Sequence, residues 1–171
     1  MHISRSNAQK MRVNQMLRKE KEMNEADTER FLVESEVGRL GVCDNNKPYV
    51  VPVLFVYDKE SGTIFVHCAK KGKKIDIMKA NPNVCFETDE KSGIIFGKSS
   101  CSFSLMYRSV IAFGEATFID DPEEKAKALN LLIKKYAGET KAGFVTPEKT
   151  ASTQVIGIRI TSKTGKQKKK D

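Results

Sequence analysis

The chain of 171 residues lacks several features that would assign it to well-known classes of protein. It has no tryptophan and only two histidines, and its four cysteines form no C-x-x-C pair, so the ligand pattern of a zinc site is missing. No apolar run approaches the ~20 residues of a membrane span, and the polar segment 1–21 has no secretory signal core. We therefore expect a cytoplasmic protein with free thiols, no metal and no membrane partner.

Several catalytic and nucleotide-binding motifs are also missing. Neither the G-x-G-x-x-G dinucleotide fingerprint nor the G-x-x-x-x-G-K-[ST] phosphate loop occurs, and no Ser/His/Asp arrangement suggests hydrolysis. The carboxylate pairs Asp120–Asp121 and Glu123–Glu124 precede an apolar stripe of helical spacing, which predicts a helix cap rather than an acid–base pair.

Positive charge is plentiful, with a net charge of +8 at pH 7. The segment 159–171 alone carries six basic residues and one acidic residue. Such a tail can bind phosphate polymers or acidic surfaces, but a solvated terminus is the simpler interpretation. Aromatic residues make up only 8% of the chain, so we expect no stacking platform and no nucleic-acid partner.

Short apolar runs separated by polar turns predict a mainly β fold, a six-stranded antiparallel split barrel with three helices. The expected strands are 39–43, 49–57, 63–68, 83–88, 109–119 and 154–161, and the expected helices are 24–38, 72–80 and 120–138. The run 49–57 is apolar enough to be buried on both faces, residues 90–105 read as a loop, and Gly114 marks a bend or bulge. The domain layout is an N-terminal arm (1–23), the barrel (24–162) and a basic tail (163–171).

The segment 64–82 carries the clearest chemical signal. A strand leads through a basic loop with Gly72 directly into a helix that begins with Lys73 and Lys74. Unpaired amides at a helix start, together with two ammonium groups, can hold a terminal phosphate. The alternative is a solvated lysine-rich turn, and the motif alone leaves both open.

A proline inside the most apolar strand is the second signal. Pro52 cannot donate to a sheet ladder, so it marks an edge or an interruption. We expect an interruption that leaves backbone groups near Val50, Val51 and Val53 free to meet the polar edge of a flavin. A β-bulge with a bound water is the alternative.

The chain resembles the FMN-binding split-barrel superfamily that includes pyridoxamine 5′-phosphate oxidase, and within it the nitroimidazole-resistance proteins. The stretches that carry the resemblance span about residues 24–166: G-R-L-G-V (38–42), K-P-Y-V-V-P-V (47–53), I-F-V-H-C-A-K-K-G-K-K (64–74), N-P-N-V-C-F (81–86), Y-R-S-V-I-A-F-G-E-A (107–116), D-P-E-E-K-A-K-A-L (121–129) and T-G-K (164–166). The R-x-V-L-L-K motif of true pyridoxamine phosphate oxidases is missing at 50–55, so pyridoxamine phosphate is not the expected substrate.

The resemblance implies an FMN site and a homodimer with flavin at the subunit interface. The residues it implies in cofactor binding are Val50, Val51, Pro52, Val53, His67, Cys68, Gly72, Lys73, Lys74, Tyr107, Arg108, Ser109 and Val110. A deazaflavin or a haem could take the place of FMN.

Only His67 is a candidate catalytic side chain, because it is the one histidine within the expected fold. It could relay protons or ligate iron, although contact with a cofactor or substrate suits its lysine-rich surroundings better. The leading hypothesis is an FMN-dependent oxidoreductase that passes electrons from a reduced nicotinamide to a small acceptor, such as a nitroaromatic. The alternative is a non-catalytic sensor or storage protein for FMN or haem.

Overall fold

The structure, a computed structural model, describes residues 17–99, 102–141 and 143–169. Residues 1–16 of the predicted N-terminal arm, and 170–171 of the predicted tail, lie outside the described residues. The elements in chain order are η1 (Lys19–Lys21), α2 (Glu25–Glu34), β1 (Val37–Asp44), β2 (Lys47–Asp58), β3 (Thr63–Ala69), α3 (Lys73–Ala80), β4 (Asn83–Ile95), β5 (Ser104–Ile119), α4 (Pro122–Lys141), η2 (Pro147–Thr150) and β6 (Thr153–Lys168).

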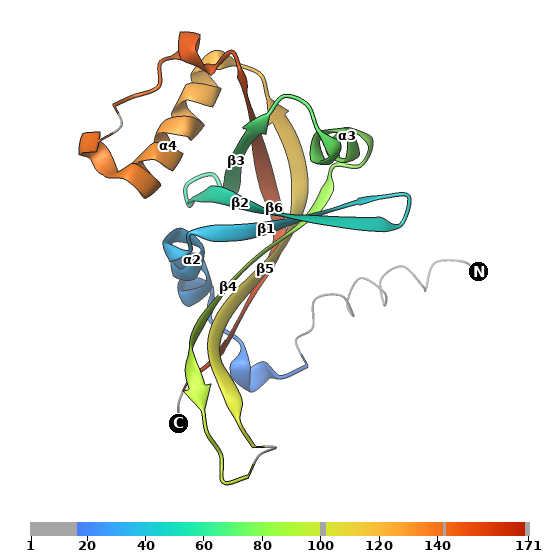
Figure 1. Cartoon of the computed structure of the whole chain (residues 1–171), viewed down its shortest axis with the longest axis vertical. Helices are drawn as coiled ribbons and strands as arrows, with labels where there is room; N and C mark the ends of the chain where they lie inside the picture. Colours follow the sequence, from blue (N-terminus) through green and yellow to red (C-terminus); the bar gives the residue numbers. More distant parts are fainter. Residues whose placement is uncertain (1–16, 100–101, 142, 170–171) are drawn as a thin grey trace.

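The six strands form one antiparallel barrel, as predicted (Figure 1), and their order around it is β1-β2-β3-β6-β5-β4. Neighbouring strands of the barrel pair over different lengths. β5 and β6 pair from Tyr107 to Ile119, whereas β2 and β3 pair only from Phe55 to Asp58. The ladder between β5 and β6 shifts register between Phe113 and Gly114, which confirms the predicted irregularity. A side chain on Gly114 would overlap the backbone of β6, so glycine permits this close approach.

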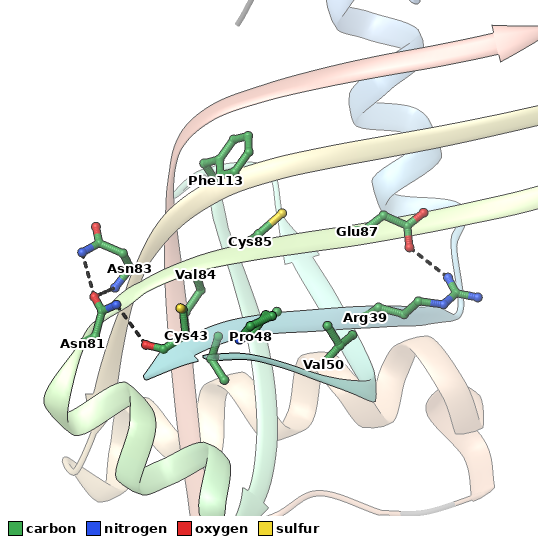
Figure 2. Close-up of a pocket in the computed structure, with 12 residues that line it drawn as sticks. Arg39, Cys43, Pro48, Val50, Asn81, Asn83, Val84, Cys85, Glu87 and Phe113 are labelled. Carbon is green, nitrogen blue, oxygen red and sulfur yellow. Dashed lines mark hydrogen bonds and ion pairs between the residues drawn. The ribbon is translucent and has the colours of Figure 1, made fainter. Parts of the chain in front are cut away.

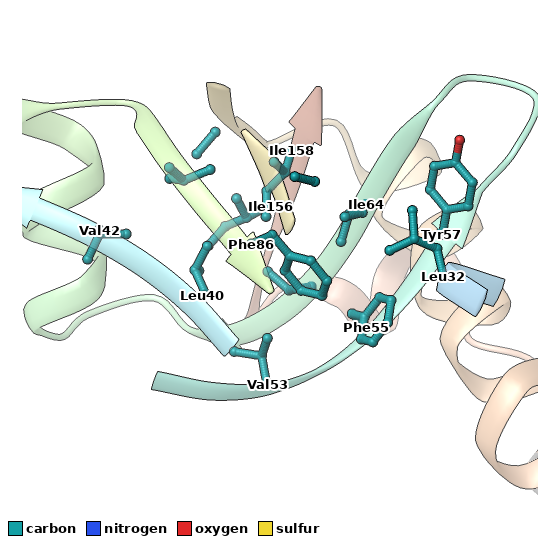
Figure 3. Packing of buried hydrophobic residues seen from close by; sticks show 14 of the residues in the cluster. Leu32, Leu40, Val42, Val53, Phe55, Tyr57, Ile64, Phe86, Ile156 and Ile158 are labelled. Atoms are coloured by element: carbon teal, nitrogen blue, oxygen red, sulfur yellow. The ribbon is translucent and has the colours of Figure 1, made fainter. Parts of the chain in front are cut away.

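The core lies inside the barrel (Figure 3), and all six strands contribute side chains to it. The rings of Phe55 and Phe86 meet edge to face, with centroids 4.7 Å apart, and neither is exposed. Phe86 occupies space beside Gly38 that a Cβ on Gly38 would overlap. A glycine in β1 therefore lets the Phe86 ring reach the centre of the barrel.

Helix caps follow the sequence signals. The Asn24 side chain accepts a hydrogen bond from Asp27 N–H at the start of α2, and Asp121 accepts one from Glu124 N–H at the start of α4. Gly138 has a φ of 70°, so the helical backbone breaks at the predicted stop. The first helix was expected to continue to about residue 38, but it ends at Glu34, because β1 begins at Val37 and pairs with β2.

Three strands run further than predicted and form an extension that we call the distal arm. β4 continues to Ile95 and β5 starts at Ser104, so half of the predicted loop 90–105 is strand. β6 was expected to end at 161 but continues to Lys168, so 163–168 are strand rather than free tail. Met23, assigned to the N-terminal arm, is buried, and its N–H donates to Gly165 C=O. These polar segments hold strand conformation through ladder pairing rather than apolar alternation.

The prediction that 49–57 is buried on both faces is wrong for the single chain. Burial alternates along β2: Val53, Phe55 and Tyr57 enter the core, whereas Val50 is 60% exposed and Leu54 is 47% exposed. The outer face of this strand is therefore apolar and uncovered within one chain.

Candidate functional site

The barrel opens where β2 and β3 separate. Residues 47–54 of β2 pair with β1 alone, and 67–69 of β3 pair with β6 alone, so each strand has an open edge there. The register between β1 and β2 is continuous through Pro52, so the predicted interruption is wrong and Pro52 marks an edge instead.

The hydrogen bonds of Phe55 show which edge of β2 the backbone N–H and C=O groups near Pro52 face. Phe55 N–H donates to the Tyr136 hydroxyl, which also bonds Glu36 C=O just before β1, so the polar groups of Phe55 face β1. Because these groups alternate between the two edges of a strand, those of Val50 and Pro52 face the open edge. A proline there removes no ladder bond, and Val50 N–H and C=O remain available to a ligand.

Helix α3 begins beside this open edge. Its N-cap is Gly72, with a φ of 137° and no side-chain cap. No heavy atom of a non-neighbouring residue lies within 4 Å of the place where a Cβ on Gly72 would stand, so the helix start is open to approach. The Lys73 ammonium lies 4.5 Å from the centre of the Tyr49 ring of β2. The amides and ammonium groups of Lys73 and Lys74 therefore gather next to the opening.

The predicted cofactor residues of β2 and β3 divide between two faces. Val53 is in the core, and Val51 and Cys68 pack against it from the inside. Burial raises the pKa of the Cys68 thiol, and the nearby Lys74 charge opposes that rise to a smaller extent. Val50, Pro52 and His67 occupy the exposed positions of their strands. The face of one flat ring can contact either the inward set or the exposed set of residues, but not both.

A groove of about 600 Å³ lies on the outer face of the sheet (Figure 2). It is lined by alternate residues of β1, β2, β4 and β5 and by the end of α3, including Cys43, Val50, Asn81, Cys85 and Phe113. Val50 joins the groove to the open edge of β2. The sequence analysis did not predict this groove. The only sign of it in the sequence is that small and apolar residues alternate in four strands, and these strands come together only in the folded chain.

One end of the groove is charged. Arg39 of β1 donates to Glu87 of β4, 3.0 Å away (Figure 2), and also to Asp89 of the same strand. Burial raises the pKa of Glu87, against the lowering effect of Arg39. The groove is thus apolar along its length and closed at this end by an ion-paired cluster.

The predicted residues 107–110 lie far from α3 within one chain. The Lys79 ammonium near the end of α3 is 5.9 Å from the Phe118 ring, and nine residues, about 30 Å of strand, separate Phe118 from Ser109. Val110 is fully buried. Side chains alternate between the two faces of a strand, so Tyr107 and Ser109 lie on the face opposite to Val110, the outer face that also carries Phe113. Within one chain, Tyr107 and Ser109 therefore do not join the α3 site.

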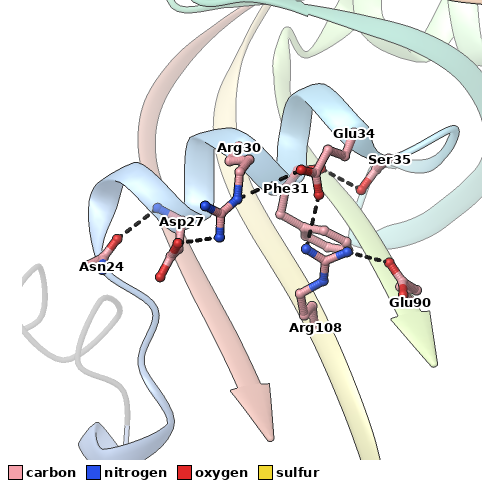
Figure 4. Close-up of polar contacts among 8 residues, drawn as sticks. All are labelled: Asn24, Asp27, Arg30, Phe31, Glu34, Ser35, Glu90 and Arg108. Atoms are coloured by element: carbon pink, nitrogen blue, oxygen red, sulfur yellow. Dashed lines mark hydrogen bonds and ion pairs between the residues drawn. The ribbon is translucent and has the colours of Figure 1, made fainter. Parts of the chain in front are cut away.

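Arg108 already has three partners, which lie on two elements, α2 and β4 (Figure 4). It bonds Glu34 of α2 at 3.0 Å and Glu90 of β4 at 2.7 Å, and its guanidinium lies 4.6 Å from the centre of the Phe31 ring. The bonds to Glu90 and Glu34 raise the pKa of Arg108. This side chain therefore anchors α2 to the sheet.

Lys135, among the described residues, has a strongly lowered pKa, and sequence reasoning gave no sign of it. Its ammonium donates to Ser35 C=O and lies 4.0 Å from the centre of the Phe55 ring. Burial lowers its pKa to about 8, against the opposing charge of Glu36. Together with the Tyr136 hydroxyl it fastens α4 to the junction of α2 and β1. A displaced pKa often marks a reactive group, but these contacts give it a structural role.

We expect the stability of the protein to rise between pH 8 and 10.5 because of Lys135. The unfolded chain keeps the Lys135 proton up to about the ordinary pKa of 10.5, whereas the folded chain releases it near 8. The folded state thus binds fewer protons in this window, and the free energy of unfolding increases with pH. Urea unfolding at several pH values measures the slope. In Lys135→Met this part of the slope should vanish, and an unchanged slope would contradict the assignment.

Among the described residues, no group of three or more His, Cys, Asp and Glu side chains is arranged to hold a metal ion. In the same part of the chain, no helix has the length and apolar character needed to cross a bilayer.

Comparison with known proteins gave matches of two kinds. The family model described as pyridoxamine 5′-phosphate oxidase matches residues 24–167. No curated protein matches the chain. Among solved structures, a protein described as a 5-nitroimidazole antibiotic resistance protein from Bacteroides thetaiotaomicron is 25% identical, with a TM-score of 0.73 over 85% of each chain.

Two further structures share the fold at lower identity. The flavocytochrome Anf3 from Azotobacter vinelandii has a TM-score of 0.75 at 19% identity, over 86% of this chain and 68% of that one. The FAD- and haem-binding protein from Mycobacterium smegmatis has a TM-score of 0.78 at 15% identity, over 88% and 74%.

Proposed function

The chain belongs to the pyridoxamine 5′-phosphate oxidase family, and from this membership and the open edge beside α3 we propose that it binds FMN and acts as a flavin-dependent oxidoreductase. The electron donor is a reduced nicotinamide, and the acceptor is a small molecule of the nitroaromatic class. The observation that carries the proposal is the uncapped start of α3 next to the strands that separate.

The start of α3 fits the phosphate of the cofactor. The first amides of a helix have no partner within the helix and lie at its positive end. Lys73 and Lys74 add two ammonium groups, and the bare Gly72 leaves room for an anion. The one carboxylate in α3, Asp76, is exposed and has no side-chain contact there that seals the helix start.

The open edge of β2 fits the ring of the cofactor. Val50 N–H and C=O are free to meet polar ring atoms, while the Val50 and Pro52 side chains offer apolar contact on the outer face. His67 is exposed on the neighbouring strand and is the candidate proton donor. FMN supplies the hydride and electron chemistry when bound, and these residues bind it, orient it and exclude water.

We further propose a homodimer that covers the outer groove. Val37, Val50, Leu54, Ile111 and Phe113 are each at least 41% exposed on the outer face of the sheet, and an apolar cluster of this kind can mark a contact with another chain. An isologous contact would bring Tyr107 and Ser109 of one chain toward the α3 site of the other.

The variant Phe113→Glu is therefore expected to be monomeric in sedimentation velocity and to lose flavin. Phe144→Glu is the matched control, because Phe144 is 78% exposed and lies beyond α4, away from the groove. A Phe113→Glu protein that stays dimeric would remove the groove from the interface.

A visible spectrum of the purified protein tests the cofactor. We expect the two bands of an oxidised flavin, released as FMN on denaturation and bleached by a reduced nicotinamide under anaerobic conditions. A flavin that is bound but not bleached would make the protein a sensor or store. A Soret band would assign it to haem, as in the flavocytochrome and the mycobacterial protein of the same fold. No pigment after incubation with excess FMN would contradict the proposal.

A further inference from the structure

The hairpin between β4 and β5 ends in exposed apolar side chains. Ile94 and Leu105 lie directly opposite each other in the ladder, and each is 43% exposed. Phe96 and Phe103, two residues nearer to the hairpin tip on either side, are 84% and 65% exposed. We call these four residues the tip patch. Exposed phenylalanines in such a cluster indicate a contact surface.

Positive charge gathers around the same end of the molecule. Figure 1 shows η1, the β4–β5 hairpin and the end of β6 together at the lower end of the view. These segments (17–22, 91–99, 102–106 and 164–169) hold eight basic residues and two acidic ones: Arg18, Lys19, Lys21, Lys91, Lys98, Lys166, Lys168 and Lys169 against Glu20 and Glu22.

The rest of the chain does not share this charge. The hairpin has a net charge of +2 and no carboxylate from Lys91 to Met106, and the whole group has +6. The other described residues sum to −1. The net charge of the described protein is therefore concentrated at the end that carries the tip patch.

We propose that this end of the molecule is a docking surface for an anionic lipid membrane. The tip patch enters the boundary between head groups and acyl chains, as apolar side chains of peripheral proteins do. The basic residues behind it lie at the level of the lipid phosphates, where each lysine adds to the attraction within a Debye length. No membrane partner was expected from the sequence, because this surface forms only when three distant segments pair.

Charge and composition favour a lipid surface over other occupants. A second copy offers no complementary charge, because the basic residues at its own distal end would repel those of this one and the remainder of its described residues sum to only −1. Single-stranded nucleic acid stacks on aromatic rings, but half of the tip patch is aliphatic, Ile94 and Leu105. The tip patch lies beyond the basic residues, and this order matches a bilayer, in which the acyl chains lie beyond the lipid phosphates.

Co-sedimentation of the full-length protein with vesicles tests the proposal. Vesicles of phosphatidylcholine with phosphatidylglycerol should bind the protein, and added salt should weaken the binding. Phe96→Ser/Phe103→Ser and Lys91→Gln/Lys98→Gln should each lower the partition coefficient by about tenfold or more. The controls are Phe144→Ser, which removes one exposed phenylalanine between α4 and η2, and Lys127→Gln/Lys149→Gln, which removes two exposed lysines at α4 and η2.

The same experiment separates the alternatives. Equal binding to pure phosphatidylcholine, no binding at all, or equal losses in the control variants would overturn the proposal. So would tighter binding to a single-stranded oligonucleotide that competes with the vesicles. If Phe96→Ser/Phe103→Ser converts a dimer into a monomer, a second copy covers the tip patch instead. The flavin content of the tip variants should stay at the level of the unmodified protein, so this test is independent of the α3 site.

Discussion

Lys73→Ala/Lys74→Ala is expected to purify without flavin and to bind added FMN at least about 100-fold more weakly than the unmodified chain. A hydrogen bond between charged partners contributes about 1.5–3 kcal/mol, and the variant removes two. Lys73 is exposed and Lys74 is half-buried, so we take the lower end of that range, about 3 kcal/mol in total. Fluorescence titration with FMN, whose emission is quenched on binding, measures the change.

The control is Lys70→Ala/Lys71→Ala, which removes the same charge from the loop before Gly72. These two lysines lie outside α3, so their loss should weaken binding by much less, through long-range attraction only. Adding salt should reduce the difference between the control and the unmodified protein. Equal losses in both double variants would mean that overall charge, rather than the helix start, attracts the cofactor.

A second large effect is expected for Gly38→Ala, which should lower the free energy of unfolding by about 3 kcal/mol, the upper end of the range for overpacked cores. The new methyl group would overlap the Phe86 ring, and that ring is fully buried against Phe55. The ring must move or the strands β1 and β4 must separate. Urea unfolding monitored by circular dichroism measures the loss.

A double-mutant cycle makes this prediction specific. Phe86→Leu alone should cost about 1–2 kcal/mol, less than the 3–5 kcal/mol typical of truncation to alanine. The smaller leucine leaves room for the methyl group, so Gly38→Ala/Phe86→Leu should lose at least about 1 kcal/mol less than the sum of the single changes. Gly157→Ala is the matched control, because its added Cβ meets its nearest neighbours at 3.4 Å, an ordinary contact. Strict additivity would show that Gly38 and Phe86 do not compete for space.

The sequence was sufficient for features that depend on neighbouring residues. Asp121 and Gly138 marked the two ends of α4, and Gly72 marked the start of α3, because caps and glycine conformations act within a few residues. Apolar runs between polar turns predicted six strands and the barrel class. The basic loop that leads into α3 also pointed to a phosphate site without knowledge of the fold.

Strand ends were less predictable, because partners across a ladder decide them. Residues 163–168 were predicted to be part of a charged tail, yet they pair with β5. Lys163 Nζ lies 2.6 Å from Oε1 of Glu25 in α2. Pro52 was predicted to mark an interruption, but β2 keeps its register with β1 through this residue. The N–H that proline lacks would face the open edge of β2, where no ladder bond is lost. Alternation within one strand cannot show which edge has a partner.

By itself the sequence determined the class of fold and the caps of its helices and led to the proposed anion site at the start of α3, since each of these depends on contacts along a short stretch of chain. Only the tertiary structure decided which strand edges remain open, which residues share the outer groove, and that the distal arm collects charge from three separate segments. Those features arise from pairing between residues far apart in the chain, and the energy of such pairing depends on partners that no local pattern reveals.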